Sequence, residues 1–190
     1  ENNEIVPAGL SLTWLRGSFE DAPELAETFR NYDDAVKELF FSNLDRMDKQ
    51  RDESPFVGNE VCAGCHAEIV SIWQKSRHAH AFATLENKGK HFDPECLACH
   101  VVGLKPWEAP ENASVEDRKF AGGTGFLSLQ TTPHLKNVQC ENCHGPARTH
   151  LENNNIKPAN NDPKMICANC HQGSHSPVFD FETYWPKIKH

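Results

Sequence analysis

The sequence predicts a mainly α-helical chain with much irregular structure, whose core is built largely around bound prosthetic groups. Three observations support this prediction. Hydrophobic residues make up only 38% of the 190 residues, which is less than globular domains normally use. Apolar residues recur at helical spacing in two stretches, residues 25–47 and 67–85. All eight cysteines fall into four copies of one short motif, so each copy marks a point where the chain can be attached to a prosthetic group.

The repeated motif is Cys-x-x-Cys-His, and we number its copies 1 to 4 in chain order. A Cys-x-x-Cys pair alone suits zinc, a redox-active dithiol or haem. Histidine makes up 11 of 190 residues, so four pairs would each be followed by histidine by chance with a probability of roughly 10⁻⁵. In a c-type site the two thiols bond to the haem vinyl groups and the histidine binds the iron. The sequence therefore predicts four covalently attached c-type haems.

Each motif supplies two attachment thiols and one proximal ligand. The predicted haem-binding thiols are Cys62 and Cys65 in motif 1, Cys96 and Cys99 in motif 2, Cys140 and Cys143 in motif 3, and Cys167 and Cys170 in motif 4. The predicted proximal iron ligands are His66, His100, His144 and His171.

Two other interpretations of the cysteines are weaker. Two Cys-x-x-Cys pairs can form one tetrahedral zinc site, so four pairs would supply two sites. That arrangement gives the four adjacent histidines no role. Disulfides within the pairs would be strained and would constrain the chain very little. Neither interpretation explains the histidines, so haem attachment remains the main prediction.

Histidine is also the expected ligand on the second, distal side of each iron. Electron-transfer haems usually take His or Met there. Met47 belongs to the apolar face of a predicted helix, and Met165 lies two residues from motif 4. We therefore expect mostly bis-histidine ligation, with the low reduction potentials that go with it.

Seven histidines lie outside the motifs and compete for the distal positions. His78 and His80 fall in the predicted helix of residues 67–85, and their spacing turns them to opposite sides. The other favoured candidates are His134, His150 on a predicted short helix, and His190; His91 and His175 lie in polar sequence and rank last.

Residues 1–55 are predicted to form an N-terminal arm, and residues 56–190 the tetrahaem domain. The arm has no cysteine and no histidine. We expect an extended segment at residues 4–13, then an amphipathic helix that starts at Asp21-Ala22-Pro23-Glu24, because a capping Asp, an early Pro and an acidic first turn are typical helix starts. This helix either packs on the haem domain or docks onto a neighbouring subunit.

Charge and hydropathy limit the partners. No stretch is long and apolar enough for a membrane span. The formal net charge of −8 argues against nucleic acid, whose binding proteins need basic patches, and suits redox partner proteins with basic docking surfaces. Because haem c is attached after export, we expect a mature periplasmic or extracellular protein whose signal peptide has been removed.

Three stretches resemble the cytochrome c554 family of tetrahaem cytochromes: IWQKSRHAHAFATL at residues 72–85, DPECLACH at 93–100 and GGTGFLSLQTTPHLKNVQCENCHGP at 122–146. The resemblance covers about residues 57–175. The stretches EIVPAGLSL and FDFETYWPKIKH resemble cytochrome domains that are fused behind metallophosphatases. No phosphatase metal motif is present in the sequence, so phosphatase activity is not implied.

The resemblance implies a mostly helical fold with stacked haems, and electron transfer. It implies that His78 is the distal ligand at motif 3, that His150 serves motif 1, and that His190, or less favourably His175, serves motif 4. The second haem of cytochrome c554 is five-coordinate, but His80 or His134 could close that position here. Similar small tetrahaem cytochromes polymerise into extracellular filaments in which one distal histidine comes from the next subunit.

The main functional hypothesis is therefore an electron-transfer protein, without catalytic acids or bases of its own. The alternative is a haem enzyme that acts on a small nitrogen or sulfur compound at a five-coordinate haem. A third hypothesis adds assembly to conduction, as a filament subunit or other homo-oligomer with a histidine donated between subunits.

Overall fold

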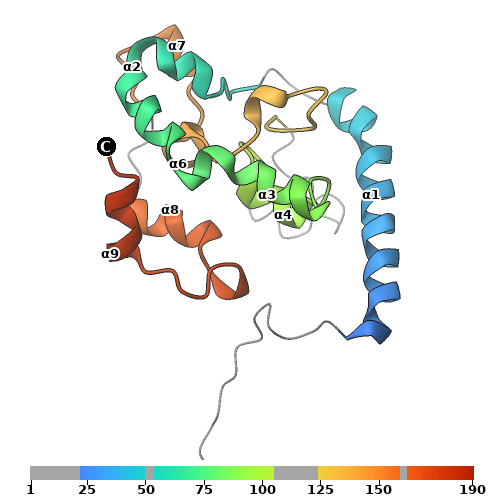
Figure 1. Cartoon of the computed structure of the whole chain (residues 1–190). Coiled ribbons are helices and arrows are strands. Elements are labelled where there is room, and N and C mark those ends of the chain that lie inside the picture. Colours follow the sequence, from blue (N-terminus) through green and yellow to red (C-terminus); the bar gives the residue numbers. More distant parts are fainter. Residues whose placement is uncertain (1–21, 50–53, 105–123, 159–161) are drawn as a thin grey trace, which may run out of the picture. The chain divides into compact units, whose positions relative to one another are not determined.

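The computed structural model describes residues 22–49, 54–104, 124–158 and 162–190 (Figure 1). Within these ranges the chain forms helices and irregular segments and no strand; an isolated bridge joins Val101 and Lys136. The prediction of a mainly α-helical chain with much irregular structure is confirmed. The extended segment predicted at residues 4–13, and the capping residue Asp21, lie outside the described residues.

The helices are short apart from the first two. The α-helices are α1 (Ala26–Lys49), α2 (Asn59–Gln74), α3 (Ala81–Lys88), α4 (Pro94–His100), α6 (Cys140–His144), α7 (Arg148–Glu152), α8 (Pro163–Cys170) and α9 (Phe181–Tyr184). The 3-10 helices are η1 (Pro23–Leu25), η2 (Arg77–His80), η4 (Pro133–Leu135), η5 (Gly173–His175) and η6 (Trp185–Lys187).

The chain divides into two compact units, residues 1–35 and residues 36–190. In the first unit the apolar side chains at the start of α1 are exposed, with Phe29 at 63%. In the second unit Val36 and Phe40 are buried. The domain boundary predicted between residues 55 and 56 remains a prediction.

The helix predicted over residues 67–85 is interrupted. Helix α2 ends at Gln74, Ser76 is extended (φ −84°, ψ 160°), and the chain continues through η2 into α3. Hydrogen bonds to residues far along the chain lie on both sides of this interruption. Trp73 Nε1 donates to Val138 O at 2.7 Å, and Phe82 N donates to Asn137 Oδ1 at 2.9 Å. His78 and His80 therefore lie on a 3-10 turn and not on an α-helix.

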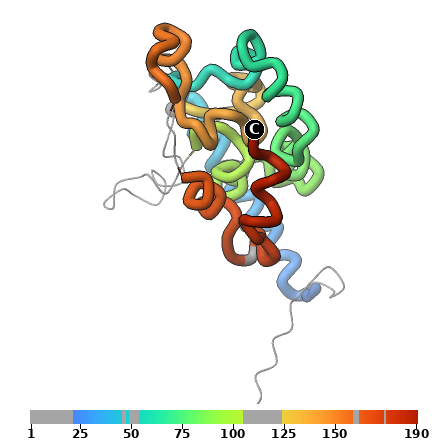
Figure 2. Tube along the Cα trace, turned by 90° about the vertical axis from the view of Figure 1, so that its left-hand side faces the viewer, coloured from blue at the N-terminus to red at the C-terminus, as the bar shows by residue number. Residues whose placement is uncertain are grey.

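A small apolar core lies between residues 36 and 135. It comprises Val36, Phe40, Phe56, Phe82, Leu85, Phe92, Leu97, Val101, Val102, Leu104, Phe126, Leu127 and Leu135. Helices α3 and α4 lie side by side at this core (Figures 1 and 2). Gly103 (φ +78°) allows two segments to meet, because a Cβ there would lie 2.7 Å from Gly125 Cα, and Phe126 N donates to Val102 O at 2.8 Å.

None of the helices in the described ranges is both long enough and apolar enough to cross a membrane.

Candidate functional site

Each Cys-x-x-Cys-His motif lies at or near the C-terminal end of a helical turn. Motifs 2 and 3 make up most of α4 and all of α6, and motif 4 ends α8, with His171 as its C-cap. Motif 1 lies inside α2, where His66 leaves helical geometry (φ −119°, ψ 39°). Residues three apart on a helix share a face, so the two thiols of each motif lie on one side and the histidine follows at the end of the turn.

Two of the motifs have helix starts that are readable from the sequence. Asp93 accepts a hydrogen bond from Glu95 N at 3.0 Å ahead of motif 2, and Asp162 accepts one from Lys164 N at 2.9 Å ahead of motif 4. A proline follows each Asp at the first helical position. Both features favour a helix start, so these attachment helices are capped by the protein itself.

Three motif histidines each face a histidine from outside the motifs. The ring centroids of His66 and His150 are 6.5 Å apart, with 26° between the ring planes. His78 and His171 are separated by 6.1 Å, and His144 and His190 by 5.8 Å. Each pair joins residues that are distant in the sequence.

The spacing of these pairs matches what one iron atom requires. A metal–imidazole bond is about 2 Å and a ring nitrogen lies about 1.1 Å from its centroid, so two imidazoles on opposite sides of one metal have centroids roughly 6 Å apart. The three observed separations, 5.8 to 6.5 Å, are close to that value. The residues present therefore fit a haem iron with two histidine ligands at motifs 1, 3 and 4.

The Nδ1 atoms of several of these rings have partners that orient them. His150 Nδ1 lies 2.8 Å from Ile156 O, and His190 Nδ1 lies 3.1 Å from Ile188 O. His171 Nδ1 lies 3.0 Å from Ser176 Oγ, and His100 Nδ1 lies 2.6 Å from Ala81 O. Metal-binding histidines commonly donate one ring N–H to the protein in this way, which leaves the other nitrogen free to bind metal.

Burial favours the neutral, ligating form of two of these rings. It lowers the pKa of His78, and the neighbouring His171 lowers it further. Burial also lowers the pKa of His171. A neutral imidazole has a lone pair for iron, whereas a protonated one does not.

Two of the pairings differ from those that the family resemblance implies. The structure places His78 beside His171 of motif 4, not beside His144 of motif 3. His190 lies beside His144, not beside His171. His150 lies beside His66, as the resemblance implies. His78 lies on the turn η2, which the sequence does not predict.

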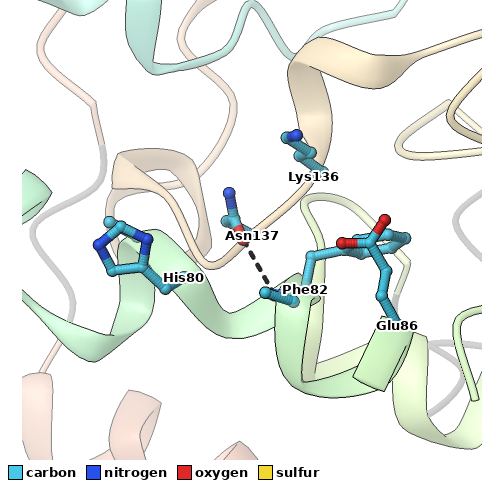
Figure 3. Close-up of a pocket in the computed structure, with 7 residues that line it drawn as sticks. His80, Phe82, Glu86, Lys136 and Asn137 are labelled. Carbon is cyan, nitrogen blue, oxygen red and sulfur yellow. Dashed lines mark hydrogen bonds between the residues drawn. The ribbon is translucent and has the colours of Figure 1, made fainter. Parts of the chain in front are cut away.

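Motif 2 differs from the other three motifs. Among the ring contacts of the described residues, His100 has no histidine opposite it. His80 is exposed and lines a cavity of about 260 Å³ with Phe82, Glu86 and Lys136 (Figure 3). His134 is also exposed. Its Cδ2 lies next to Gly58, 3.4 Å from the point that a Cβ would occupy if Gly58 were replaced by alanine. The two candidates for this position are therefore not brought to His100.

The two lowest-ranked histidines have different surroundings. His175 is exposed, at the end of η5. His91, expected in a polar environment, instead lies near two aromatic rings, with centroid distances of 6.5 Å to Phe82 and 5.8 Å to Phe92. Its Nδ1 is buried without a hydrogen-bond partner.

Thiols of different motifs approach one another. Cys62 of motif 1 contacts Cys140 of motif 3, and this contact raises the pKa of Cys62 and lowers that of Cys140. Cys99 of motif 2 contacts Cys170 of motif 4, which lowers the pKa of Cys99 to about 7 and raises that of Cys170.

A charge effect between two thiols relates motifs 3 and 4. Burial raises the pKa of Cys143, and the charge of Cys167 raises it further. The two thiol contacts thus relate motif 1 to 3 and motif 4 to 2, and the charge effect relates motif 3 to 4.

Sequence reasoning missed two residues at the motifs. Glu141, inside motif 3, is only 2% exposed and accepts backbone hydrogen bonds from other segments. Phe179 stacks on His171 with a centroid distance of 4.5 Å and 13° between the planes. For Glu141, a charged residue between two cysteines was a visible signal in the sequence. The position of Phe179 depends on a turn that no sequence motif indicates.

Within the described ranges, no group of three or more His, Cys, Asp or Glu side chains lies close enough together to hold a metal ion. A structural zinc site needs four such ligands. The geometry therefore gives no support to the zinc interpretation of the cysteine pairs.

Comparison with known proteins finds a family match for the middle of the chain. Residues 61–145 match the family model described as cytochrome c554 and c-prime. Cytochrome c-554 of Nitrosomonas europaea is 28% identical over 111 residues, a match that covers 50% of this chain and 40% of that protein. No solved structure matches the chain. The resemblance noted from the motifs is confirmed: residues 61–145 are similar to the cytochrome c554 family.

Proposed function

We propose that this protein binds four covalent c-type haems and transfers electrons along them. The observation that carries the proposal is the spacing of three histidine pairs, 5.8 to 6.5 Å between ring centroids, each joining a motif histidine to a second one. A bound haem supplies an iron that alternates between ferric and ferrous states. The family match and the eight motif cysteines support the same conclusion.

The pairs indicate which residues would hold three of the four irons. His66 and His150 serve motif 1, His144 and His190 serve motif 3, and His171 and His78 serve motif 4. Histidine on both sides keeps reduction potentials low compared with methionine ligation. The protein thus supplies ligation and burial, and electron transfer needs no acid or base from it.

The thiol contacts support a path through the protein. Groups bonded to thiols that touch must be neighbours, which joins motif 1 to motif 3 and motif 2 to motif 4. The effect of the Cys167 charge on Cys143 supports a further link, between motifs 3 and 4. We infer that electrons pass in the order of motifs 1, 3, 4 and 2, or the reverse.

The two ends of this path would exchange electrons with redox partner proteins. The formal net charge of −8 favours partners with basic docking surfaces. Attachment of c-type haem follows export, so we place the protein in the periplasm or outside the cell.

Motif 2 supports a second candidate function. No histidine of the described residues lies opposite His100 in the manner of the other three pairs. An open iron position there would allow a small nitrogen or sulfur compound to bind and react. A histidine from a second copy of the chain, His80 or His134 among the exposed ones, would instead close the position and link subunits into an oligomer or filament.

The first test is a haem count, followed by electron paramagnetic resonance of the oxidised protein. Mass spectrometry should find four haems on the mature chain, and three irons should be low-spin at every protein concentration. Substituting His78, His150 or His190 by Ala should each convert one low-spin iron to high-spin, whereas His175→Ala should convert none. Four low-spin signals that survive all three substitutions would contradict the ligand assignment.

The fourth iron decides among the remaining functions. A high-spin signal at all concentrations indicates an open position and favours the enzyme. A signal that becomes high-spin only on dilution indicates a histidine from another subunit.

A further inference from the structure

Motif 3 is the only one of the four motifs with an acidic residue between its cysteines. The first intervening residue is Glu141 in motif 3, and it is Ala63, Leu97 and Ala168 in motifs 1, 2 and 4. Acidic side chains are rarely buried without a partner. Glu141 is nevertheless only 2% exposed, so the position of its carboxylate needs an explanation.

Backbone N–H groups from two other segments surround the Glu141 carboxylate. Val57 N lies 3.1 Å from Oε1 and 3.0 Å from Oε2, and Gly58 N lies 2.9 Å from Oε2. Ala147 N donates to Oε1 at 2.9 Å. The first two donors directly precede the helix of motif 1, and the third follows motif 3, so one side chain connects the two motifs.

These contacts match an ionised carboxylate. Both oxygens accept hydrogen bonds, which an ionised carboxylate does and a protonated one does only in part. No cationic side chain contacts Glu141 in the described part of the chain; Arg148, which follows motif 3, directs its Nε to Ser54 O. The negative charge is therefore held by dipoles and is not cancelled by a positive charge.

The charge acts on the attachment points of motifs 1 and 3. The pKa of the Cys62 thiol is raised first by its contact with Cys140, then by burial, and further by the charge of Glu141. Glu141 also acts to raise the pKa of Cys140, against the larger lowering effect of Cys62. A buried charge is weakly screened, so it acts on neighbouring groups more strongly than a surface charge does.

We propose that Glu141 is a positioning residue that joins motifs 1 and 3 and lowers the reduction potentials of the two haems they hold. This inference rests on the proposed function. A ferric iron carries one more positive charge than a ferrous iron, so a fixed anion nearby stabilises the ferric state. The same anion is absent from motifs 2 and 4, whose haems it should affect less.

The test compares Glu141→Gln with the unchanged holoprotein and with Glu60→Gln. Glu60 lies two residues before Cys62, but its side chain is exposed. The measurement is a redox titration followed by NMR of the haem methyl groups, in which each haem accepts one electron. We expect Glu141→Gln to shift the ferric-to-ferrous equilibrium of the haems at motifs 1 and 3 about tenfold toward ferrous, which is 59 mV for a one-electron couple. Glu60→Gln should shift it far less.

A second variant separates charge from structure. Glu141→Asp retains the charge but shortens the side chain, so it should weaken the fold while leaving the potentials low. A folded Glu141→Gln protein with four haems and unchanged potentials would overturn the proposal. So would a rise in potential as large in Glu141→Asp as in Glu141→Gln.

The unchanged protein provides a test if Glu141→Gln does not fold. The two lowest of its four potentials should then belong to the haems at motifs 1 and 3, and any other assignment overturns the proposal. Failure of the proposed function is distinct from both results, because it would appear as fewer than four haems in the mass spectrum.

Discussion

Motifs 3 and 4 have the same sequence pattern, but the protein holds them by different means. At motif 3, Gln139 is 4% exposed; its Oε1 accepts from Asn59 N and its Nε2 donates to His134 O, both at 2.7 Å. Asn142 Nδ2 donates to Val101 O at 2.8 Å. At motif 4, no described residue from 162 to 190 is buried.

The contacts of motif 4 are mostly local. Asp162 caps α8, Ser176 contacts the His171 ring, and Phe179 and Tyr184 pack beside that ring. Motif 3 is thus fixed by polar contacts to segments near motifs 1 and 2. Motif 4 is fixed by rings gathered around its own histidine, His171. The difference teaches that one motif is tied to distant segments of the polypeptide, whereas the other is held mostly by its sequence neighbours.

Removal of single haems should give the largest difference between the two regions. We expect the double variant Cys167→Ala/Cys170→Ala to lose amide protection throughout residues 162–190, because few buried contacts remain there. The matched variant Cys140→Ala/Cys143→Ala should retain protection at Val102 and Val138, whose amides donate to Leu135 O and His78 O. Hydrogen exchange with mass spectrometry measures both. An equal loss of amide protection in the two variants would contradict the difference between motifs 3 and 4.

A cavity in the apolar core should give the next largest effect. Phe82 is 1% exposed and contacts Phe126 at a centroid distance of 5.4 Å. We expect Phe82→Ala to lower the free energy of unfolding by about 3–5 kcal/mol. Val178→Ala, in the motif 4 region at 68% exposure, should change it by less than about 0.5 kcal/mol. Denaturant unfolding of the holoprotein measures both values, and similar losses would show that the second region also has a core.

The asparagines before the last cysteine of motifs 3 and 4 form a matched pair. Asn142 accepts from Gln139 N and donates to Val101 O, both at 2.8 Å, whereas the Asn169 side chain makes no such contact in the described structure. Two lost hydrogen bonds should cost Asn142→Ala about 2 kcal/mol of stability. Asn169→Ala should stay within about 0.5 kcal/mol of the original. A large effect at Asn169 would mean that its side chain binds something other than the described protein.

Features that depend on neighbouring residues could be predicted from the sequence. The four motifs follow from spacing, and the α1 helix follows from its apolar repeat. The Asp-Pro pairs at the starts of α4 and α8 were visible signals that we did not use. Each needs only a few consecutive residues.

Features that depend on distant residues could not be predicted. The break after α2 requires Val138 and Asn137 to reach Trp73 and Phe82. The family resemblance implies that His78 serves motif 3 and His190 serves motif 4, whereas packing places them beside His171 and His144. Glu141 was visible as a residue, but its burial was not.

The smallest expected effect concerns α9, in the motif 4 region. Thr183 N donates to Asp180 Oδ2 at 2.9 Å, and the hydrogen bonds from Thr183 hold the pKa of Asp180 below its usual 3.8. Because the folded pKa is lower than the unfolded one, the carboxylate stabilises the folded state fully above pH 3.8, and this contribution is lost as the pH falls through the lowered pKa.

Asn caps helices about as well as Asp but does not titrate. In Asp180→Asn, the stability of α9 should therefore differ slightly from that in the original protein near neutral pH and match it in acid. Amide exchange within residues 181–184, measured across that pH range, tests this expectation. A difference that persists in strong acid would show that the cap acts through shape and not through charge. It would also imply that even this exposed end of the chain is ordered by contacts other than its own ionised groups.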